Sequence, residues 1–518
     1  MSTLPDLKPG RVISNWQPED ETFWNQSGKT IANRNLWISI PNLLLAFSVW
    51  MMWSIITVQM KNLGFPFDDQ QLFGLAAIAG LSGATLRIPN SFLIAISGGR
   101  NVIAFSTAML LIPAIGAGLA LQDKNTSYFT FAALAFLSGI GGGNFASSMS
   151  NINRFFPKKV QGAALGLNAG IGNLGVSVMQ VLIPAVMTVA VFGPLSGDPA
   201  ELIKNESVSQ VWIQNAGFIW VPILLIAALA AWFGMVNLPG ASFTSTADAL
   251  IKATGLTLIG FAAAGIGAWL LIGLKLNMWI VLPVTILACL GLMKLVPGAI
   301  KTSLNAQFAI FSNKHNWIMT VLYIMTFGSF IGFSAAFPLL IKIVFGSLPD
   351  GSINPAAPNP FTYAWLGPLV GSLIRPVGGW LSDKFGGARV THWDTIFMIA
   401  CALGVAWFIV QAREASDPTQ YFTPFLLCFL LLFITTGIGN GSTFRMIPFI
   451  FNPQQAGPVL GWTSAIGAYG AFIIPKVFGE QVKAGTPEYA LFGFTAFYVI
   501  CLVLNWWYYA RKGAEVPC

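Results

Sequence analysis

The chain has 518 residues, of which 55% are hydrophobic and 9% are charged, whereas soluble globular proteins carry about 25% charged residues. This deficit excludes a water-soluble globular protein, because it leaves little surface for water along the whole length, and it indicates a chain embedded in a lipid bilayer. The net charge of +8 does not indicate nucleic-acid binding, because the basic residues are spread over short loops and form no stretch interleaved with aromatics.

The first 35 residues are polar and contain no apolar core of the signal-peptide type, so we expect them to stay in the cytoplasm. Within them, residues 20–34 carry Phe23, Trp24 and Ile31 among polar side chains, which predicts a helix lying on the membrane surface. The cysteines show no paired spacing, so we expect buried apolar side chains and neither a disulfide nor a metal site at Cys289, Cys401, Cys428, Cys501 and Cys518.

Long apolar runs follow one another along the rest of the chain. A membrane-spanning helix needs about 20 mostly apolar residues. Fourteen runs meet this length, near residues 36–59, 71–96, 101–121, 127–150, 161–191, 212–237, 254–274, 278–296, 316–345, 361–382, 393–412, 421–444, 457–479 and 488–510. An even number of spans places both chain ends on one side of the membrane.

The charges in the loops give the orientation. With the N-terminus inside, 17 lysine and arginine residues fall in cytoplasmic segments, 8 fall in outer segments, and two arginines remain within the membrane. Basic residues gather in the cytoplasmic loops of membrane proteins. The sequence therefore predicts that both termini are cytoplasmic.

Internal repeats relate the two ends of the chain. Residues 139–143 recur as residues 437–441, an offset of 298, and Leu86-Arg87 recurs as Ile374-Arg375, an offset of 288. A third match has an offset of 295 and pairs Gly166, Ile171, Gly172 and Gly175 with Gly461, Ile466, Gly467 and Gly470. The common order predicts two six-helix halves related as parallel repeats.

These matches set the expected domain boundaries. The N-terminal segment covers residues 1–35, and the two halves cover residues 36–237 and 316–510. A linker over residues 238–315 carries two extra helices, 254–274 and 278–296, and residues 511–518 form a cytoplasmic tail.

Two arginines lie inside predicted spans, Arg87 in the second and Arg375 in the tenth, at matching positions of the repeats. An arginine at mid-membrane costs about 2.5–3.5 kcal/mol, so a matched pair indicates function. Arg375 is the weaker case, because Asp383, near the inner surface, follows eight residues later. If the halves face each other, the two guanidiniums converge on one site. Guanidinium is planar and binds small planar oxyanions through paired hydrogen bonds, so the pair predicts an anion site.

Acidic groups and histidines are expected only at the ends of the runs. His315, His392, Asp394 and Asp383 are placed at helix ends on the inner face. A proton-coupled carrier usually keeps a titratable group within the membrane, and arginine does not deprotonate. We therefore favour anion exchange over proton symport. In this hypothesis the empty site carries two unpaired positive charges and resists reorientation, and a bound monoanion neutralises one of them.

Glycines at small-xxx-small spacing let helices approach closely, which favours rocking of one half on the other. The glycines concerned are Gly166, Gly170, Gly172 and Gly175 in one half, and Gly461, Gly467 and Gly470, with Ser464, in the other. Plain helix packing explains any one of them equally well. Of the amides Asn168 and Asn173, one is expected to donate a hydrogen bond to the substrate and the other to bridge helices.

Aromatic residues also fall near the expected site. Tyr323 and Phe327 lie four residues apart and so share a helix face, and Phe145 follows Asn144 in the fourth run. Aromatics above and below a flat anion would exclude water. In the inner loop, Asp383 and Arg389 fit either a charge clamp that breaks during switching or an ordinary solvated turn.

Several segments resemble a known family. Residues 379–389 resemble the loop signature of the major facilitator superfamily, although the equivalent first-half loop, residues 97–100, lacks the aspartate. Residues 164–180 and 461–476 resemble the two nitrate-signature helices of the nitrate/nitrite porter family. Residues 34–41, 144–149 and 326–335 resemble its NarK type, and the similarity covers nearly the whole chain apart from residues 240–310.

The resemblance implies an all-helical major facilitator fold and nitrate/nitrite exchange across a bacterial inner membrane, in support of nitrate respiration or assimilation. It also implies roles for individual residues: anion binding for Arg87 and Arg375, polar substrate contacts for Asn173 and Tyr323, and an aromatic pair enclosing the ion for Phe145 and Phe327. The family typically has twelve helices, so the inserted pair is a departure that affects the linker more than the site.

Two other transport functions stay open. Nitrate/proton symport is disfavoured by the lack of a mid-membrane acid, and an anion channel is disfavoured by the repeat halves and by a positive pair that should hold anions tightly. A sensor or scaffold lacks a soluble domain, and no nucleophile–base set, metal cluster or phosphate loop indicates an enzyme. We expect small inorganic anions and the lipid bilayer as partners, no nucleic acid, no cofactor, and a monomer.

Overall fold

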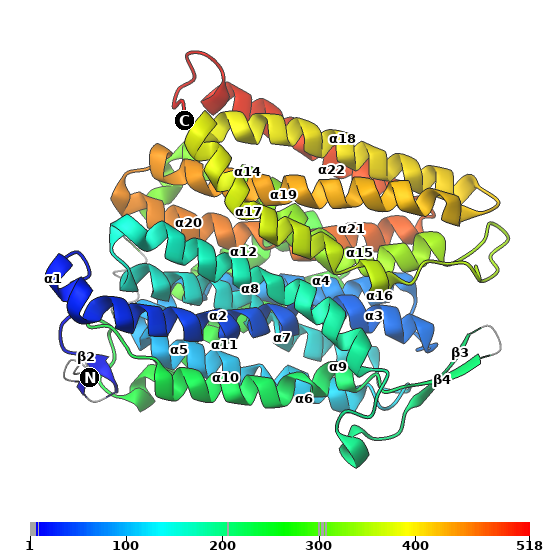
Figure 1. Ribbon diagram of the computed structural model, residues 1–518, viewed down its shortest axis with the longest axis horizontal. Coiled ribbons are helices and arrows are strands. Elements are labelled where there is room, and N and C mark those ends of the chain that lie inside the picture. The colour runs from blue at the N-terminus through cyan, green and yellow to red at the C-terminus, as the bar shows by residue number, and fades with distance from the viewer. Residues whose placement is uncertain (1–6, 9, 205–206, 299–300, 302–304, 306–307) are drawn as a thin grey trace.

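The computed structural model describes residues 7–8, 10–204, 207–298, 301, 305 and 308–518. Within them the chain is almost entirely helical, and the long helices run roughly side by side (Figure 1). This confirms the expected all-helical membrane architecture. Two short antiparallel hairpins were not predicted: β1 (Leu7–Lys8) with β2 (Val12–Ile13), and β3 (Ala200–Lys204) with β4 (Ser207–Val211).

The first half begins with α1 (Glu21–Phe23) and a π-helical turn, η1 (Trp24–Gly28), which run directly into α2. The segment expected to lie on the membrane surface is therefore the first part of a single helical stretch, residues 21–62. The remaining helices of this half are α2 (Lys29–Met51), α3 (Trp53–Asn62), α4 (Asp69–Ser97), α5 (Gly99–Met109), α6 (Leu111–Ala120), α7 (Tyr128–Phe155), α8 (Lys158–Val186), α9 (Asn215–Phe218) and α10 (Trp220–Gly234).

The second half is built in the same way. Its helices are α14 (Lys314–Tyr323), α15 (Ser329–Phe345), α16 (Pro360–Tyr363), α17 (Leu366–Phe385), α18 (Gly387–Glu414), α19 (Phe422–Ile450), α20 (Pro453–Gly467), α21 (Gly470–Lys483) and α22 (Glu488–Asn505). A π-helical turn, η4 (Ile324–Gly328), joins α14 to α15, and such turns occur often at functional sites. The chain ends on a third π-helical turn, η6 (Trp506–Ala510), and a short tail.

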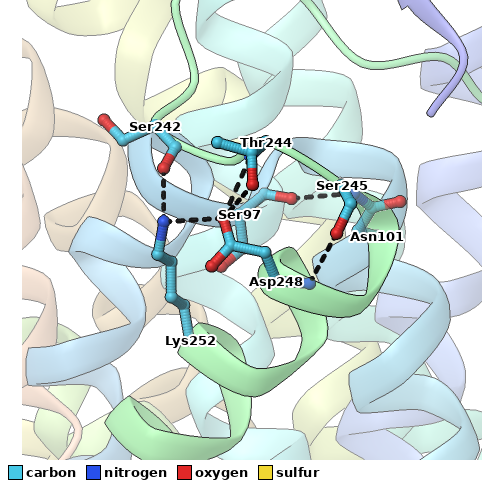
Figure 2. Close-up of polar contacts among 7 residues, drawn as sticks. All are labelled: Ser97, Asn101, Ser242, Thr244, Ser245, Asp248 and Lys252. Atoms are coloured by element: carbon cyan, nitrogen blue, oxygen red, sulfur yellow. Dashed lines mark hydrogen bonds and ion pairs between the residues drawn. The ribbon is translucent and has the colours of Figure 1, made fainter. Parts of the chain in front are cut away.

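Two helices are inserted between the halves, α11 (Thr246–Ile272) and α12 (Met278–Lys294), followed by the 3₁₀ turn η3 (Ala309–Ser312). The pair packs mainly on α4. In Figure 2 the start of α11 is fixed by its own cap: Ser245 accepts a hydrogen bond from the Asp248 amide, and Lys252 pairs with Asp248 at 2.8 Å. Capping of this kind stabilises the beginning of a helix.

Each of the fourteen predicted runs contains a helix or a pair of helices. Eleven helical stretches in the described part of the chain are long and apolar enough to cross a membrane, and α12 is an apolar helix of 17 residues. Helix α17, which carries Arg375, and the pair α20–α21 are not among the eleven. Helices therefore exist at all fourteen predicted positions, and eleven of these positions hold a helical stretch that is long and apolar enough to cross a membrane.

The two halves meet along α4 with α21, α8 with α17, and α3 with α15. Strand β2 and the C-terminal end of the chain lie at one end of the helices, and the β3–β4 hairpin lies at the opposite end (Figure 1). The side of the membrane on which the two chain ends lie stays a prediction.

Candidate functional site

Arg87 lies in the middle of α4 and its side chain is fully enclosed, with 0% exposure. Its Nε donates to the Gly142 carbonyl of α7 at 2.9 Å, and its Nη1 donates to the Ser464 carbonyl of α20 at 3.2 Å. The remaining nitrogen, Nη2, is buried and has no hydrogen-bond partner among the described residues. The guanidinium thus links the two halves and keeps one donor free.

Aromatic rings surround this guanidinium. Its Cζ lies 4.7 Å from the ring centroid of Phe145 and 5.0 Å from that of Phe327, within cation–π range. Trp50 and Phe47 contact it from α2 at 5.4 and 5.9 Å. Sequence reasoning missed these two, although they lie three residues apart on one helix and so share a face. The ring cage removes water from Arg87 without neutralising its charge.

The predicted aromatic pair comes together from opposite halves. The rings of Phe145 and Phe327 are 6.2 Å apart and nearly parallel, at 26°. Rings at this distance pair directly with each other. Their role in enclosing an ion stays a prediction.

Arg375 lies in α17 and is half-buried. Its Nη2 donates to the Tyr323 hydroxyl at 3.1 Å, while its Nη1 is buried without a hydrogen-bond partner among the described residues. Tyr323 stacks on Phe327 with ring centroids 5.5 Å apart, and Phe444, which sequence reasoning missed, faces the Arg375 guanidinium at 5.5 Å. The two arginines are therefore connected by a series of side-chain contacts that runs from Arg375 through Tyr323 and Phe327 to Arg87.

The two arginines share one electrostatic environment. Their charges act on each other and on the Tyr323 hydroxyl. Neither guanidinium pairs with a carboxylate anywhere in the described ranges. Two like charges held together without a counter-charge attract an anion, and each arginine retains a buried, unpaired N–H to bind it.

A cavity of about 1020 Å³ lies between the halves. The deep end of the cavity is lined by Arg375, Phe145 and Ser464. Its mouth at the protein surface is lined by Asp383 and Arg445. Arg87 is not part of the lining, because Phe145 and Ser464 cover it. The cavity opens on the side of β2 and the C-terminal end, which the loop charges predict to be the inner side.

The two candidate amides differ in their partners. The Asn168 amide donates to the Ser148 hydroxyl of α7 at 2.8 Å, so it bridges α8 to α7. Asn173 is 1% exposed and its Oδ1 has no hydrogen-bond partner in the part of the chain described. Asn168 therefore bridges two helices. The Asn168 Oδ1 also lacks a partner among the described residues, and a carbonyl oxygen accepts rather than donates, so a hydrogen bond from Asn173 to an anion stays a prediction.

The signature glycines fall into two groups. A Cβ on Gly175 would meet the Leu44 carbonyl at 2.1 Å, and one on Gly470 would meet the Gly328 carbonyl at 2.1 Å; Gly172 and Gly467 are similarly tight against Leu43 and Tyr323. A Cβ on Gly166 or Gly170 would meet nothing within 4 Å, and one on Gly461 would touch only Ser91, at 3.7 Å. The tight glycines pack against helices of their own half, and Gly166, Gly170 and Gly461 line the cavity.

The inner-loop charges pair differently from the expected clamp. Asp383 at the end of α17 forms an ion pair with Arg445 of α19. Arg389 is exposed and takes no part in this pair. The sequence could not indicate this partner, because Arg445 lies 62 residues from Asp383 and no local pattern connects the two.

Asp394 corrects one expectation. It is 6% exposed, and its Oδ2 lies against Gly439 of α19 beside Thr326 of η4, with no hydrogen-bond partner in the described ranges. The expectation of a helix end at the inner face is wrong, because α18 begins at Gly387 and both α19 and η4 cover the next two turns. An enclosed carboxyl therefore exists near the site, so proton symport is no longer disfavoured by the lack of an acid within the helices.

Comparisons with known proteins agree with this architecture. Residues 38–475 match the family model of the Major Facilitator Superfamily. The chain is 41% identical to the probable nitrate/nitrite antiporter NarK2 of Thermus thermophilus, over 98% of this chain and 99% of that protein. It is 39% identical to the nitrate/nitrite transporter NarU of Escherichia coli K12, over 97% and 96% of the two chains.

Solved structures share the fold at low identity. A bacterial homologue of the lysosomal transporter Spinster, inward-facing and occupied, matches with a TM-score of 0.58 at 13% identity, over 92% of this chain and 96% of that one. The xylose transporter XylE of E. coli, partially occluded and inward open, matches with a TM-score of 0.55 at 13% identity, over 92% and 97%. The chain belongs to the major facilitator superfamily of membrane transporters and, within it, to the NarK-type nitrate/nitrite porter family.

Proposed function

We propose that this protein exchanges nitrate and nitrite across the bacterial inner membrane by alternating access. The observation that carries the proposal is the pair Arg87 and Arg375, which converge from the two halves, lack a carboxylate partner among the described residues, and each keep a buried unpaired nitrogen. The names of the relatives, nitrate/nitrite antiporter and transporter, support the same substrates. Nitrate and nitrite are flat monoanions whose oxygens suit the planar guanidinium.

The cavity supports an inward-open state of such a cycle. Its outer end is closed by contacts between the halves: Gln180 Nε2 donates to the Ser334 carbonyl at 3.0 Å, and Ser177 Oγ donates to the Trp365 carbonyl at 2.9 Å. To release anions outside, these contacts must break and the inner cavity must close. We propose that residues 36–237 and 316–510 move as the two halves, with both termini in the cytoplasm and the protein acting as a monomer.

The unpaired donors explain why exchange is favoured over one-way transport. Arg87 is already enclosed, and closing the inner cavity without an anion would also remove the half-buried Arg375 from water, leaving two positive charges without a counter-charge, which is costly. A bound monoanion supplies acceptors to both guanidiniums and removes one unit of charge. The empty carrier is therefore expected to reorient far more slowly than the loaded one.

Flux into vesicles tests this directly. Purified protein in liposomes preloaded with nitrite is expected to take up labelled nitrate rapidly, and empty liposomes are expected to show only slow uptake. Protein-free liposomes are the control. Equal uptake into empty and preloaded vesicles would contradict exchange: a channel passes nitrate down its gradient in both, and a symporter does so when a pH gradient is applied.

Asp394 gives one specific reason to test proton symport as the second candidate, because it is an enclosed carboxyl beside the turn that carries Phe327. Asparagine has nearly the same shape but cannot release a proton. If the protein is an exchanger, Asp394→Asn is expected to retain nitrate/nitrite exchange within a few-fold of the wild type. Loss of pH-driven uptake with exchange retained would instead assign proton coupling to Asp394.

Tyr323→Phe is expected to weaken nitrate binding about 10- to 100-fold, because it removes the hydroxyl that holds Arg375 and a hydrogen bond to a charged group is worth about 1.5–3 kcal/mol. Nitrate titration of the purified protein, followed by intrinsic fluorescence, measures the change. Tyr498→Phe is the matched control. It removes a buried hydroxyl that forms a 2.7 Å hydrogen bond with Ser329 and does not contact either arginine. An equal loss in both variants would contradict a specific role for Tyr323.

A further inference from the structure

A second group of arginines lies away from the transport site, on the face where β2 and the C-terminal end lie. Arg11 follows β1, Arg34 lies near the start of α2, and Arg100 lies in the first turn of α5. Three hydrogen bonds hold the backbone of Arg11, the backbone of Arg100 and the side chain next to Arg34 against the segment Val236–Asn237. Asn237 N–H donates to the Arg11 carbonyl at 3.0 Å, Arg100 N–H donates to Asn237 Oδ1 at 2.9 Å, and Val236 N–H donates to Asn35 Oδ1, next to Arg34, at 3.0 Å.

The positive charge of Arg11 lies close enough to affect the other two arginines. Arg11 acts electrostatically on both Arg34 and Arg100. No ion pair in the described part of the chain involves any of the three. Moreover, Arg11 Nε, Arg34 Nε and Arg34 Nη2 are buried and have no hydrogen-bond partner among the described residues. Buried charged donors without acceptors are costly, so their clustering calls for an anionic ligand.

The backbone is specialised to hold this cluster. Arg11 has φ +55°, and Arg11 and Lys275 are the two non-glycine residues with positive φ in the described ranges. The left-handed conformation is unfavourable for a side chain of this kind, and here the Asn237 bonds hold it in place. Asn237 Nδ2 also donates to the Gly10 carbonyl at 3.0 Å, so one side chain fixes the turn that carries Arg11.

Arg100 is fixed rigidly as well. It is 5% exposed, its Nε donates to the Trp232 carbonyl at 2.7 Å, and its Cζ lies 4.0 Å from the Trp232 ring centroid. Its Nη1 donates to Asn101 Oδ1 at 2.9 Å, and Asn101 in turn donates to the Ser97 carbonyl, a bond drawn in Figure 2. All these acceptors are neutral. The N-terminal end of α5 adds its own partial positive charge at this point.

We expect the cluster to lie at the depth of lipid headgroups. Trp37, one turn after Arg34 on α2, is 59% exposed, and exposed tryptophans mark the membrane–water interface. Basic pockets between helices on the cytoplasmic side bind phosphorylated headgroups, and guanidinium binds phosphate oxygens in pairs. We propose that Arg11, Arg34 and Arg100 form a binding site for a phosphate group, supplied by an anionic phospholipid headgroup or by soluble phosphate.

Full-length protein in nanodiscs tests the proposal. Thermal unfolding is compared between phosphatidylcholine alone, phosphatidylcholine with phosphatidylglycerol, and phosphatidylcholine with millimolar inorganic phosphate, while mass spectrometry of the intact protein counts retained phosphatidylglycerol. The wild type is expected to gain several degrees in Tm in one of the two phosphate-bearing arms, and the arm that responds identifies the source.

Arg34→Gln and Arg11→Gln are expected to lose most of this gain and to bind about tenfold more weakly, because each removes a charged donor group. Lys29→Gln is the matched control: it removes the same charge from an exposed position on α2 and is expected to keep the gain. Arg34→Lys keeps the charge and serves as a control for misfolding. Its gain in Tm is expected to lie between those of the wild type and Arg34→Gln. Equal Tm gains and equal lipid retention in all variants would overturn the proposal.

Discussion

Nitrate binding is expected to weaken by about 10²- to 10⁴-fold when Arg87 is replaced by lysine. Lysine keeps the charge but cannot reach the Gly142 and Ser464 carbonyls and the anion together, because its three donors share one nitrogen. Two charge-assisted bonds at about 1.5–3 kcal/mol each account for that range. Titration of the purified variant with nitrate, followed by fluorescence or calorimetry, gives the affinity.

Arg375→Lys is expected to act in the same direction and to a smaller degree. Arg375 is half-buried, and its guanidinium forms one hydrogen bond among the described residues, to the Tyr323 hydroxyl, so water can partly replace what is lost. Arg511→Lys, a half-buried arginine beyond the last helix, is the control and should bind nitrate like the wild type. Unchanged affinity in both Arg87→Lys and Arg375→Lys would refute a site that depends on the guanidinium shape.

Exchange is expected to stop when Gly170 is replaced by leucine, while nitrate binding persists. A Cβ added at Gly170 would meet nothing within 4 Å, so we expect the fold and the arginine site to stay intact in this variant. Gly170 lines the cavity that must close on reorientation, and a leucine would occupy the space that the opposite half has to enter. Nitrite/nitrate exchange in liposomes measures transport, and nitrate titration of the same protein measures binding.

Two further variants make this prediction specific. Gly493→Leu adds the same bulk on an exposed face of α22, where nothing lies within 4 Å, and should transport normally. Gly470→Ala should instead lower Tm by several degrees, because its Cβ would press on the backbone of Gly328 and neither helix can yield cheaply. Normal exchange by Gly170→Leu would show that the inner cavity does not close around this position.

The helices and the arginine pair could be predicted from the sequence. Apolar runs of about 20 residues must be helical in a bilayer, because the lipid offers no partners for free backbone groups. All fourteen runs contain helices, and Arg87 and Arg375 occupy the same place in two repeats. The length of an apolar run and the repetition of a motif can be read directly from the sequence. Neither depends on which helices contact each other.

Contacts between distant segments could not be predicted in this way. Asp383 pairs with Arg445, and Asp394 is enclosed by α19 and η4, because helices distant in sequence pack over them. The signature glycines share one sequence pattern but lie in two different environments. Gly175 packs tightly against Leu44, whereas Gly170 lines the cavity.

The sequence by itself determined the positions and order of the helices and the presence of two arginines, Arg87 and Arg375, without a carboxylate partner among the described residues. These follow from hydrophobic length and from the cost of charge in lipid, which act residue by residue. The tertiary structure alone decided that Tyr323 and Phe327 connect those cations, that a cavity reaches Arg375, and that Asn237 is bonded to both Arg11 and Arg100. Such contacts depend on how whole helices cross, and pairs hundreds of residues apart leave no periodic trace along the chain.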